Sequence, residues 1–396
     1  MAEIEPLLQP RADEHRPPES EEQANSSSTI AKRKAARVAS LDVFRGLCVF
    51  LMMLVDYAGS IFPIIAHAPW NGIHLADFVM PFFLFVAGVS VAIVYKKVSD
   101  RVEATWKALF RALELFVLGV FLQGGYFHGV TSLTYGVDIE KMRLLGILQR
   151  IAIGYIVAAL CEIWLPCQRW RGDGFPRNYN WQWALIWVVC SGLAISGASR
   201  FLYADSEVLS RGGDLSPACN AAGMVDRYIL GVDHLYAKPV YRNLKECNLS
   251  SHGQVPQTSP SWCHAPFDPE GVLSSLTAAV TCIIGLQYGH ILTQLQHHKE
   301  RLWNWSIFSV SLMGLGLFLA FLGIPLNKSL YTISYLMVTS ASAGITFCVL
   351  YTLVDVYGWR CLTCVGVDGE AFTEYLYSRN FKHNRDNRSR ILLESS

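Results

Sequence analysis

Long apolar stretches separated by short polar connections run through most of the chain. A helix needs roughly 20 mainly apolar residues to cross the hydrocarbon core of a bilayer, and about eight stretches reach this length. They cover residues 44–62, 78–95, 108–126, 144–165, 182–203, 271–293, 303–322 and 330–356. The pattern predicts an all-α fold, a polytopic transmembrane helix bundle of about eight spans.

Three segments do not fit this pattern. Residues 1–37 are rich in Glu, Gln, Pro and Ser and are expected to form a disordered tail. Residues 204–270 form a loop that is too long to be a simple connection. Residues 360–396 are polar and are expected to form a second tail, so the membrane domain is expected over residues 38–359.

The distribution of Lys and Arg predicts the orientation of the bundle, because cytosolic loops carry an excess of both residues. The first tail ends in a basic cluster at residues 32–37, which places the N-terminus in the cytosol. The connection 63–77 contains neither Lys nor Arg and falls on the opposite, lumenal side. By the same alternation the 204–270 loop is lumenal and the C-terminal tail is cytosolic, with the lipid bilayer as the surrounding partner.

Composition agrees with a membrane protein. The 396 residues are 52% hydrophobic and 16% charged, whereas soluble domains carry roughly 25% charged residues. The net charge of +1 gives no basis for nucleic-acid binding. Cys361 and Cys364 form a lone pair of the C-x-x-C type, so no metal site is expected. Two of Cys219, Cys247 and Cys263 can form a disulfide if the long loop faces an oxidising lumen, and the sequence leaves open which two.

The first candidate for chemistry is His67, in the predicted lumenal connection between two apolar stretches. Asp56 lies in the preceding stretch, and Asp77 lies at the start of the next one. A histidine oriented by a carboxylate can act as a nucleophile or a general base near neutral pH, and either Asp could orient it. His74 is a competing histidine in the same connection.

Charged residues within the apolar stretches are further candidates, because ionisable groups in hydrocarbon are costly. Asp42 and Arg45 are three residues apart, so on a helix they either pair with each other or leave Arg45 to bind a phosphate or carboxylate from the cytosol. Arg150 should face the bundle interior, where Glu114 could be its partner. Structural pairing and anion binding both remain open for Arg150.

Polar residues at the predicted lumenal surface suit a sugar or another polar ligand. The candidates for binding it are Asn71, Asp233, His234 and Asp268. Asp268 followed by Pro and Glu is equally a good start for a helix.

Several motifs taken together resemble the heparan-alpha-glucosaminide N-acetyltransferase family, and the chain looks most similar to its plant-type members. The likeness runs in collinear order from about residue 38 to residue 359. The motifs are Ser40–Gly46, Ala66–Gly72, Ala76–Phe85, Gly146–Arg150, Ala222–Arg227, Asp233–Tyr236 and Asp268–Leu273.

The resemblance implies a multi-pass enzyme that carries an acetyl group from cytosolic acetyl-CoA, its co-substrate, to an amino-sugar-like amine in an organelle lumen. In that family a histidine of the first lumenal loop is catalytic, and His67 stands at that position. Asp56 stands where the animal enzyme has Asn. Arg45 and Arg150 are candidates for the CoA phosphates on physical grounds. The segment Glu3–Leu8 resembles an acidic dileucine signal, which is consistent with a vacuolar or lysosome-type membrane.

The resemblance is incomplete at one end. The family continues through further spans, roughly eleven in all, whereas the likeness stops near Trp359. An inactive truncated isoform is therefore an alternative to an active enzyme, and a homo-oligomer is open for either. A secondary transporter of a small polar solute is another alternative, because Asp56, Glu114 and Arg150 would suit that function as well.

Overall fold

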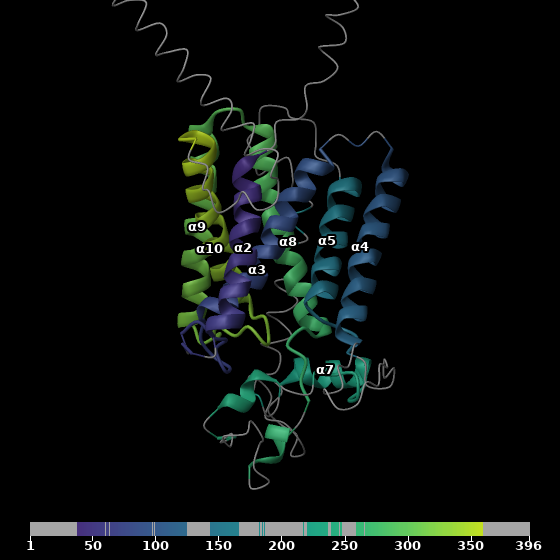
Figure 1. Ribbon diagram of the computed structural model, residues 1–396. Helices are drawn as coiled ribbons and strands as arrows, with labels where there is room; N and C mark the ends of the chain where they lie inside the picture. Colours follow the sequence, from purple (N-terminus) through teal and green to yellow (C-terminus); the bar gives the residue numbers. More distant parts are fainter. Residues whose placement is uncertain are drawn as a thin grey trace, which may run out of the picture. The chain divides into compact units, whose positions relative to one another are not determined.

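The computed structural model describes residues 38–124, 143–165 and 220–358 with short gaps, together with isolated positions between 182 and 217. Within these ranges the chain forms long helices that stand side by side, and it forms no β-strand (Figure 1). The long helices are α2 (Ala39–Ala58), α3 (Leu75–Val94), α4 (Arg101–Gly124), α5 (Ile147–Trp164), α8 (Val272–Gln294), α9 (His298–Phe321) and α10 (Ile333–Tyr351). The all-α prediction is confirmed.

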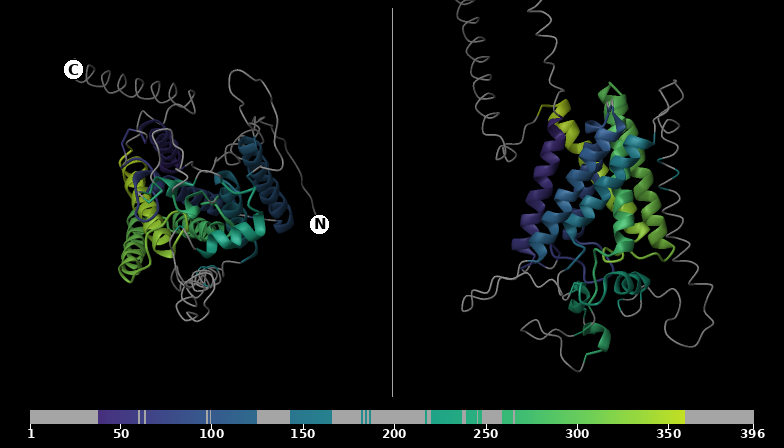
Figure 2. Two further views of the ribbon diagram at one scale, coloured as in Figure 1. Left: turned by 90° about the horizontal axis from the view of Figure 1, so that it is seen from below. Right: turned by 90° about the vertical axis from the view of Figure 1, so that its right-hand side faces the viewer.

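Five stretches of the described chain are long and apolar enough to cross a membrane. They are Ala76–Val94, Ile147–Trp164, Val272–Gln294, His298–Phe321 and Ile333–Val356. Helices α2 and α4 stand alongside them, and charged residues are spread along both (Figure 2). The polytopic bundle is thus confirmed, while the number of eight spans stays a prediction, since the expected span 182–203 lies largely outside the described residues.

Helix α8 is the central element of the bundle and contacts α3, α5, α9 and α10. It is buried along most of its length, which explains why its sequence shows no apolar stripe on one side. Its polar side chains find partners inside the bundle, as when the hydroxyl of Thr281 lies 2.9 Å from that of Tyr331. Helix α9, in contrast, exposes most of its apolar side chains and is suited to contact lipid.

The backbones of α3 and α8 approach closely because glycines stand at their contact. A Cβ atom on Gly285 would lie 2.2 Å from the carbonyl oxygen of Phe85, and one on Gly88 would lie 1.9 Å from that of Cys282. Small residues at such crossings are the usual means of packing helices in membranes. Larger residues here would force α3 and α8 apart.

We therefore expect Gly285→Ala to destabilise the bundle by about 1–3 kcal/mol, the usual cost of overpacking. Gly314→Ala is the matched control, because a Cβ on Gly314 in α9 meets nothing within 4 Å. Thermal unfolding of the purified protein in detergent measures both variants. Equal midpoints for the two variants would contradict the close approach of α3 and α8.

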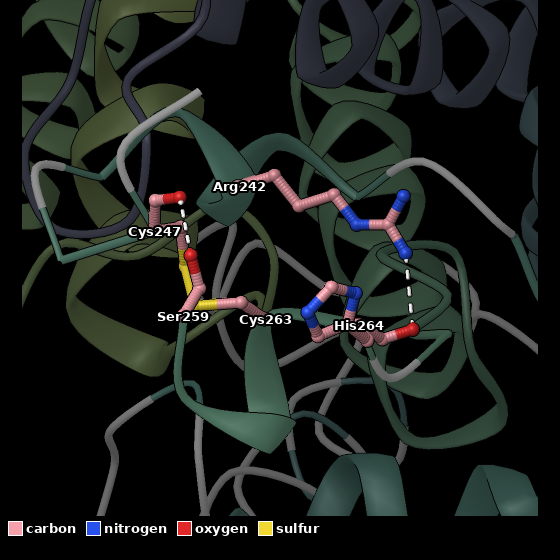
Figure 3. Close-up of a disulfide and its surroundings, with 5 residues drawn as sticks. All are labelled: Arg242, Cys247, Ser259, Cys263 and His264. Carbon is pink, nitrogen blue, oxygen red and sulfur yellow. Dashed lines mark hydrogen bonds between the residues drawn. A yellow bond between two sulfur atoms is a disulfide. The ribbon is translucent and has the colours of Figure 1, made fainter. Parts of the chain in front are cut away.

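A smaller segment lies beyond one end of the bundle and contains α7 (Ala221–Leu230), η3 (Val240–Asn243) and η4 (Ser261–His264) (Figure 1). Cys247 and Cys263 form a disulfide in this segment, as Figure 3 shows. The third cysteine considered for pairing, Cys219, lies outside the described residues.

Aromatic packing joins this segment to the connection between α2 and α3. The ring of Trp70 lies 5.9 Å from that of Tyr241 and 5.7 Å from that of Phe267, and all three are buried. Edge-on aromatic pairs at such distances add stability beyond their buried area. The connection that carries His67 is thereby fixed from outside the bundle.

Candidate functional site

Two connections meet at the end of the bundle where α3, α5, α8 and α10 begin (Figure 1). One precedes α3 and the other joins α9 to α10. The backbone N–H of Gly72 donates to the carbonyl of Leu326 over 2.9 Å, and the amide of Asn327 donates to Oδ1 of Asn71 over 3.3 Å. Asn71, predicted to bind substrate, is placed where it ties the two connections together.

His67 and Asp77 are in direct contact, as one of the two predicted pairings required. Nδ1 of His67 lies 2.9 Å from Oδ1 of Asp77. The other carboxylate oxygen accepts from the backbone N–H groups of Ala68, at 3.2 Å, and His74, at 3.0 Å. Asp77 is fully buried at the first turn of α3, whereas 39% of the His67 side chain is exposed. The site therefore consists of a solvent-accessible imidazole whose orientation is fixed by contact with a buried carboxylate.

The other candidates for this pair are placed differently. Asp56 is exposed on α2 and is absent from the contacts of His67 in the described structure. His74 is at the start of α3, where its Nδ1–H donates to the carbonyl of Ala66 over 3.2 Å. The geometry thus favours His67 over His74 and Asp77 over Asp56.

Sequence reasoning missed Lys328, which lies in the connection between α9 and α10. Its Nζ is 2.9 Å from Nδ1 and 3.4 Å from Nε2 of His67, and 3.5 Å from Oδ1 of Asp77. Burial and the charge of Arg150 lower the pKa of Lys328, although Asp77 and Glu270 oppose the shift. A single lysine far along the chain carries no local pattern that would connect it to His67.

Arg150 is buried at the first turn of α5, facing inward as predicted. Its Nη2 donates to the carbonyl of Pro269 and the hydroxyl of Ser274, each at 2.5 Å, and its guanidinium lies 5.4 Å from the ring centre of Tyr331. The prediction that Glu114 could pair with Arg150 is wrong, because Glu114 is exposed on α4 whereas Arg150 is buried. Two other acids interact electrostatically with Arg150: Glu270, from the segment leading into α8, and Asp226 of α7.

Arg143 binds two buried acids ahead of α8. Its Nε and Nη2 donate to the two carboxylate oxygens of Asp268 over 2.8 and 2.5 Å, and Nη2 also contacts Glu270. Burial alone would raise the pKa of Glu270, but Arg150, Arg143 and Lys328 together lower it. Asp268, predicted to bind substrate, is thus placed in an internal ion pair, and the network connects to Lys328 through Glu270.

The remaining predicted residues are Arg45, Asp233 and His234. Arg45 donates to Asp42 over 3.0 Å and to Ser90 over 2.6 Å, near the end of α3 that is opposite to Asp77. The structure therefore does not bring Arg45 and Arg150 together. Asp233 is exposed and His234 is half-buried in the turn after α7.

Asp226 of α7 caps α8 from outside that helix. Its Oδ1 accepts from the backbone N–H of Val272 over 2.8 Å, and the approach leaves no room for a Cβ on Gly271. Burial, together with the nearby charge of Asp268, raises the pKa of Asp226 to about 6. This carboxyl couples the outer segment to the start of the most buried helix.

Bundle and site together define a polytopic helical membrane protein with a histidine–carboxylate pair at one end. The chain is 30% identical over 353 residues to human (Homo sapiens) heparan-alpha-glucosaminide N-acetyltransferase, an alignment that covers 81% of this chain and 49% of the human protein. The mouse (Mus musculus) protein of the same name is 29% identical over 356 residues, covering 83% of this chain and 51% of the relative. No protein-family model matches the chain.

The chain therefore belongs to the heparan-alpha-glucosaminide N-acetyltransferase family, and the resemblance drawn from the motifs is confirmed. It spans about half the length of the curated relatives it matches.

We expect Arg143→Gln to destabilise the protein by about 3–5 kcal/mol, because it leaves the buried carboxylate of Asp268 without its cation and removes one of the cations beside Glu270. Lys107→Gln removes an exposed partner of Glu103 and should cost only about 0.3–0.5 kcal/mol. Thermal unfolding in detergent compares the two variants. A loss for Arg143→Gln as small as that for Lys107→Gln would mean that the acids are not held by Arg143.

Asp226 should make stability depend on pH. Its pKa is raised from 3.8 to about 6 in the folded protein, so the stabilisation from its protonated form is lost as pH rises from about 4 to about 6. This amounts to at most about 3 kcal/mol. Asn is neutral at every pH. We therefore expect the stability of Asp226→Asn to rise relative to that of the wild type between about pH 4 and pH 6. Unfolding midpoints between pH 4 and 8 that run parallel for both proteins would contradict this.

Proposed function

We propose that the chain is a multi-pass membrane acetyltransferase that moves an acetyl group from acetyl-CoA to an amine, of the amino-sugar type, in an organelle lumen. The observation that carries the proposal is the contact between Nδ1 of His67 and Oδ1 of Asp77, with the ring accessible from outside. The relatives are named as N-acetyltransferases, and that name supports this reaction over solute transport.

The geometry suits His67 to transfer a proton or an acyl group. When Nδ1–H donates to Asp77, the lone pair of Nε2 is free. As a general base, Nε2 takes the proton of the acceptor amine while the amine nitrogen attacks the thioester carbonyl and the CoA thiolate leaves. As a nucleophile, Nε2 itself attacks that carbonyl and the CoA thiolate leaves; the amine then attacks the acetyl-imidazole, Nε2 leaves as the free imidazole, and the amine proton is released. Both routes require Nε2 without a proton.

Binding of the two substrates involves both ends of the bundle in this proposal. Arg45 is about half exposed, so its guanidinium can meet a CoA phosphate at the end of the bundle opposite to His67. Arg150 is enclosed by protein groups and fits structural pairing better than phosphate binding. Asp233 and His234, at the same end as His67, remain candidates for the polar acceptor.

The end that carries His67 is the lumenal one in this proposal, with the N-terminus in the cytosol and the protein in a vacuolar or lysosome-type membrane. The absence of Lys and Arg from residues 63–77 supports this orientation. The Cys247–Cys263 disulfide supports it independently, because disulfides persist in oxidising compartments.

Transfer of labelled acetyl from acetyl-CoA to glucosamine by the purified protein tests the proposal. We expect His67→Ala to lower the rate by about 10²–10⁴-fold, the usual contribution of a positioned acid–base group. His297→Ala, an exposed histidine at the start of α9, should transfer as the wild type does. Undiminished transfer by His67→Ala would refute the role of His67, and a wild type without transfer would favour the inactive alternative.

A paired substitution tests which carboxylate orients His67. Asp77→Asn should lower transfer at least about tenfold, because an amide cannot hold the imidazole in the same protonation state. Asp56→Asn should retain most of the rate, since Asp56 is exposed on α2 and the described contacts of the His67 ring are with Asp77 and Lys328. A larger loss for Asp56→Asn than for Asp77→Asn would reverse the assignment.

A further inference from the structure

His67 faces a carboxylate and an ammonium group at the same time. Oδ1 of Asp77 and Nζ of Lys328 are each 2.9 Å from Nδ1 of the ring. A ring nitrogen has one in-plane position, which either holds a proton and donates or holds a lone pair and accepts. The carboxylate and the ammonium therefore cannot both be hydrogen-bonded to Nδ1 in that position.

The position of Lys328 shows that Asp77, and not Lys328, is hydrogen-bonded at the in-plane position of Nδ1. Nζ is only 3.4 Å from Nε2 as well. A donor aligned with the in-plane lone pair of Nδ1 would lie on the far side of the ring from Nε2 and much more distant from it. The ammonium therefore lies against the face of the ring, and Nδ1–H is left to donate to Asp77.

The connection that carries Lys328 is rigid, so this placement is built into the fold. Oδ1 of Asn327 accepts from the backbone N–H of Leu330 over 3.0 Å, and the hydroxyl of Thr332 donates to the carbonyl of Pro325 over 2.8 Å. Tyr331 has φ of 47°, a left-handed conformation that is rare for a bulky residue. Such strain persists where the surroundings over-determine the backbone.

We propose that Lys328 is a positioning residue for His67, whose ammonium charge opposes a second proton on the imidazole and so keeps Nε2 free. This inference rests on the proposed function for its consequence, since an acyl transfer in an acidic lumen needs an unprotonated Nε2. Asp77 alone would do the opposite, because a carboxylate stabilises the imidazolium. Lys328 offsets that effect and leaves Asp77 to select the tautomer.

Two other charged groups near the pair act on Lys328. Glu270 favours its ammonium form and Arg150 disfavours it. His74 is turned to the carbonyl of Ala66, and the hydroxyl of Tyr335 donates to the backbone carbonyl of Asp77. In the described structure, Lys328 is the cation that lies against the His67 ring.

The test replaces the charge and keeps the length of the side chain. Lys328→Met removes the ammonium, Lys328→Arg retains a cation, and Lys107→Met on the exposed surface of α4 is the matched control. The first readout is the rate at which diethyl pyrocarbonate modifies His67 between pH 4.5 and 8, followed by peptide mass spectrometry. This reagent reacts with the unprotonated ring and needs no acetyl transfer. The second readout is the pH profile of acetyl transfer to glucosamine.

We expect the midpoint of His67 modification to move to higher pH in Lys328→Met and to stay in place in Lys328→Arg and Lys107→Met. The acidic limb of the transfer profile should move likewise, with the rate at high pH retained. An unmoved midpoint in Lys328→Met overturns the inference, as does a uniform loss of rate at all pH in both Lys328 variants. Lys328→Gln serves the same comparison if Lys328→Met does not fold.

The two readouts separate this inference from the proposed function. A shifted modification midpoint in a protein that transfers no acetyl group would support the role of Lys328 while refuting the reaction. Transfer that depends on His67 with an unmoved midpoint would support the reaction and refute the role of Lys328.

Discussion

The carboxylate of Asp77 is the constraint on which the site depends. It is fully buried, yet it accepts from the ring of His67 and from two backbone N–H groups of the connection that precedes α3. A buried carboxylate is stable only when it is hydrogen-bonded or paired, so these donors and the carboxylate hold one another in place. The same carboxylate therefore fixes both the conformation of the connection and the orientation of His67.

Position within the bundle explains why so much charge gathers near Asp77. Helices α3, α5, α8 and α10 all begin at this end. Their N-termini carry partial positive charge and favour acids, which matches Asp77 in the first turn of α3 and Asp226 at the start of α8. The acids in turn allow Arg143 and Arg150 to be buried, since an unpaired buried charge would be prohibitive.

Sequence patterns predicted what depends on local spacing. Apolar length predicted the helices, and proximity along the chain suggested that His67 could meet Asp77 or Asp56. The choice between the two acids required the direction of each side chain: Asp56 sits on the exposed side of α2, while Asp77 starts α3 facing inward. The pairing of Arg150 was wrong for the same reason, because Glu114 points outward from α4, although hydropathy gave no sign of this.

Lys328 lay beyond such reasoning, because 261 residues separate it from His67 and only the closed bundle brings them together. Tight packing of α3 on α8, and of α10 on both, fixes the distance between the connection before α3 and the one before α10. The backbone bridge and the side-chain hydrogen bond between Asn71 and Asn327 then fix how these two connections lie against each other. The geometry around His67 consequently depends on close packing at glycines such as Gly285 deep in the bundle. A change in helix spacing there would separate the ammonium of Lys328 from the pair of His67 and Asp77 without altering any of the three side chains.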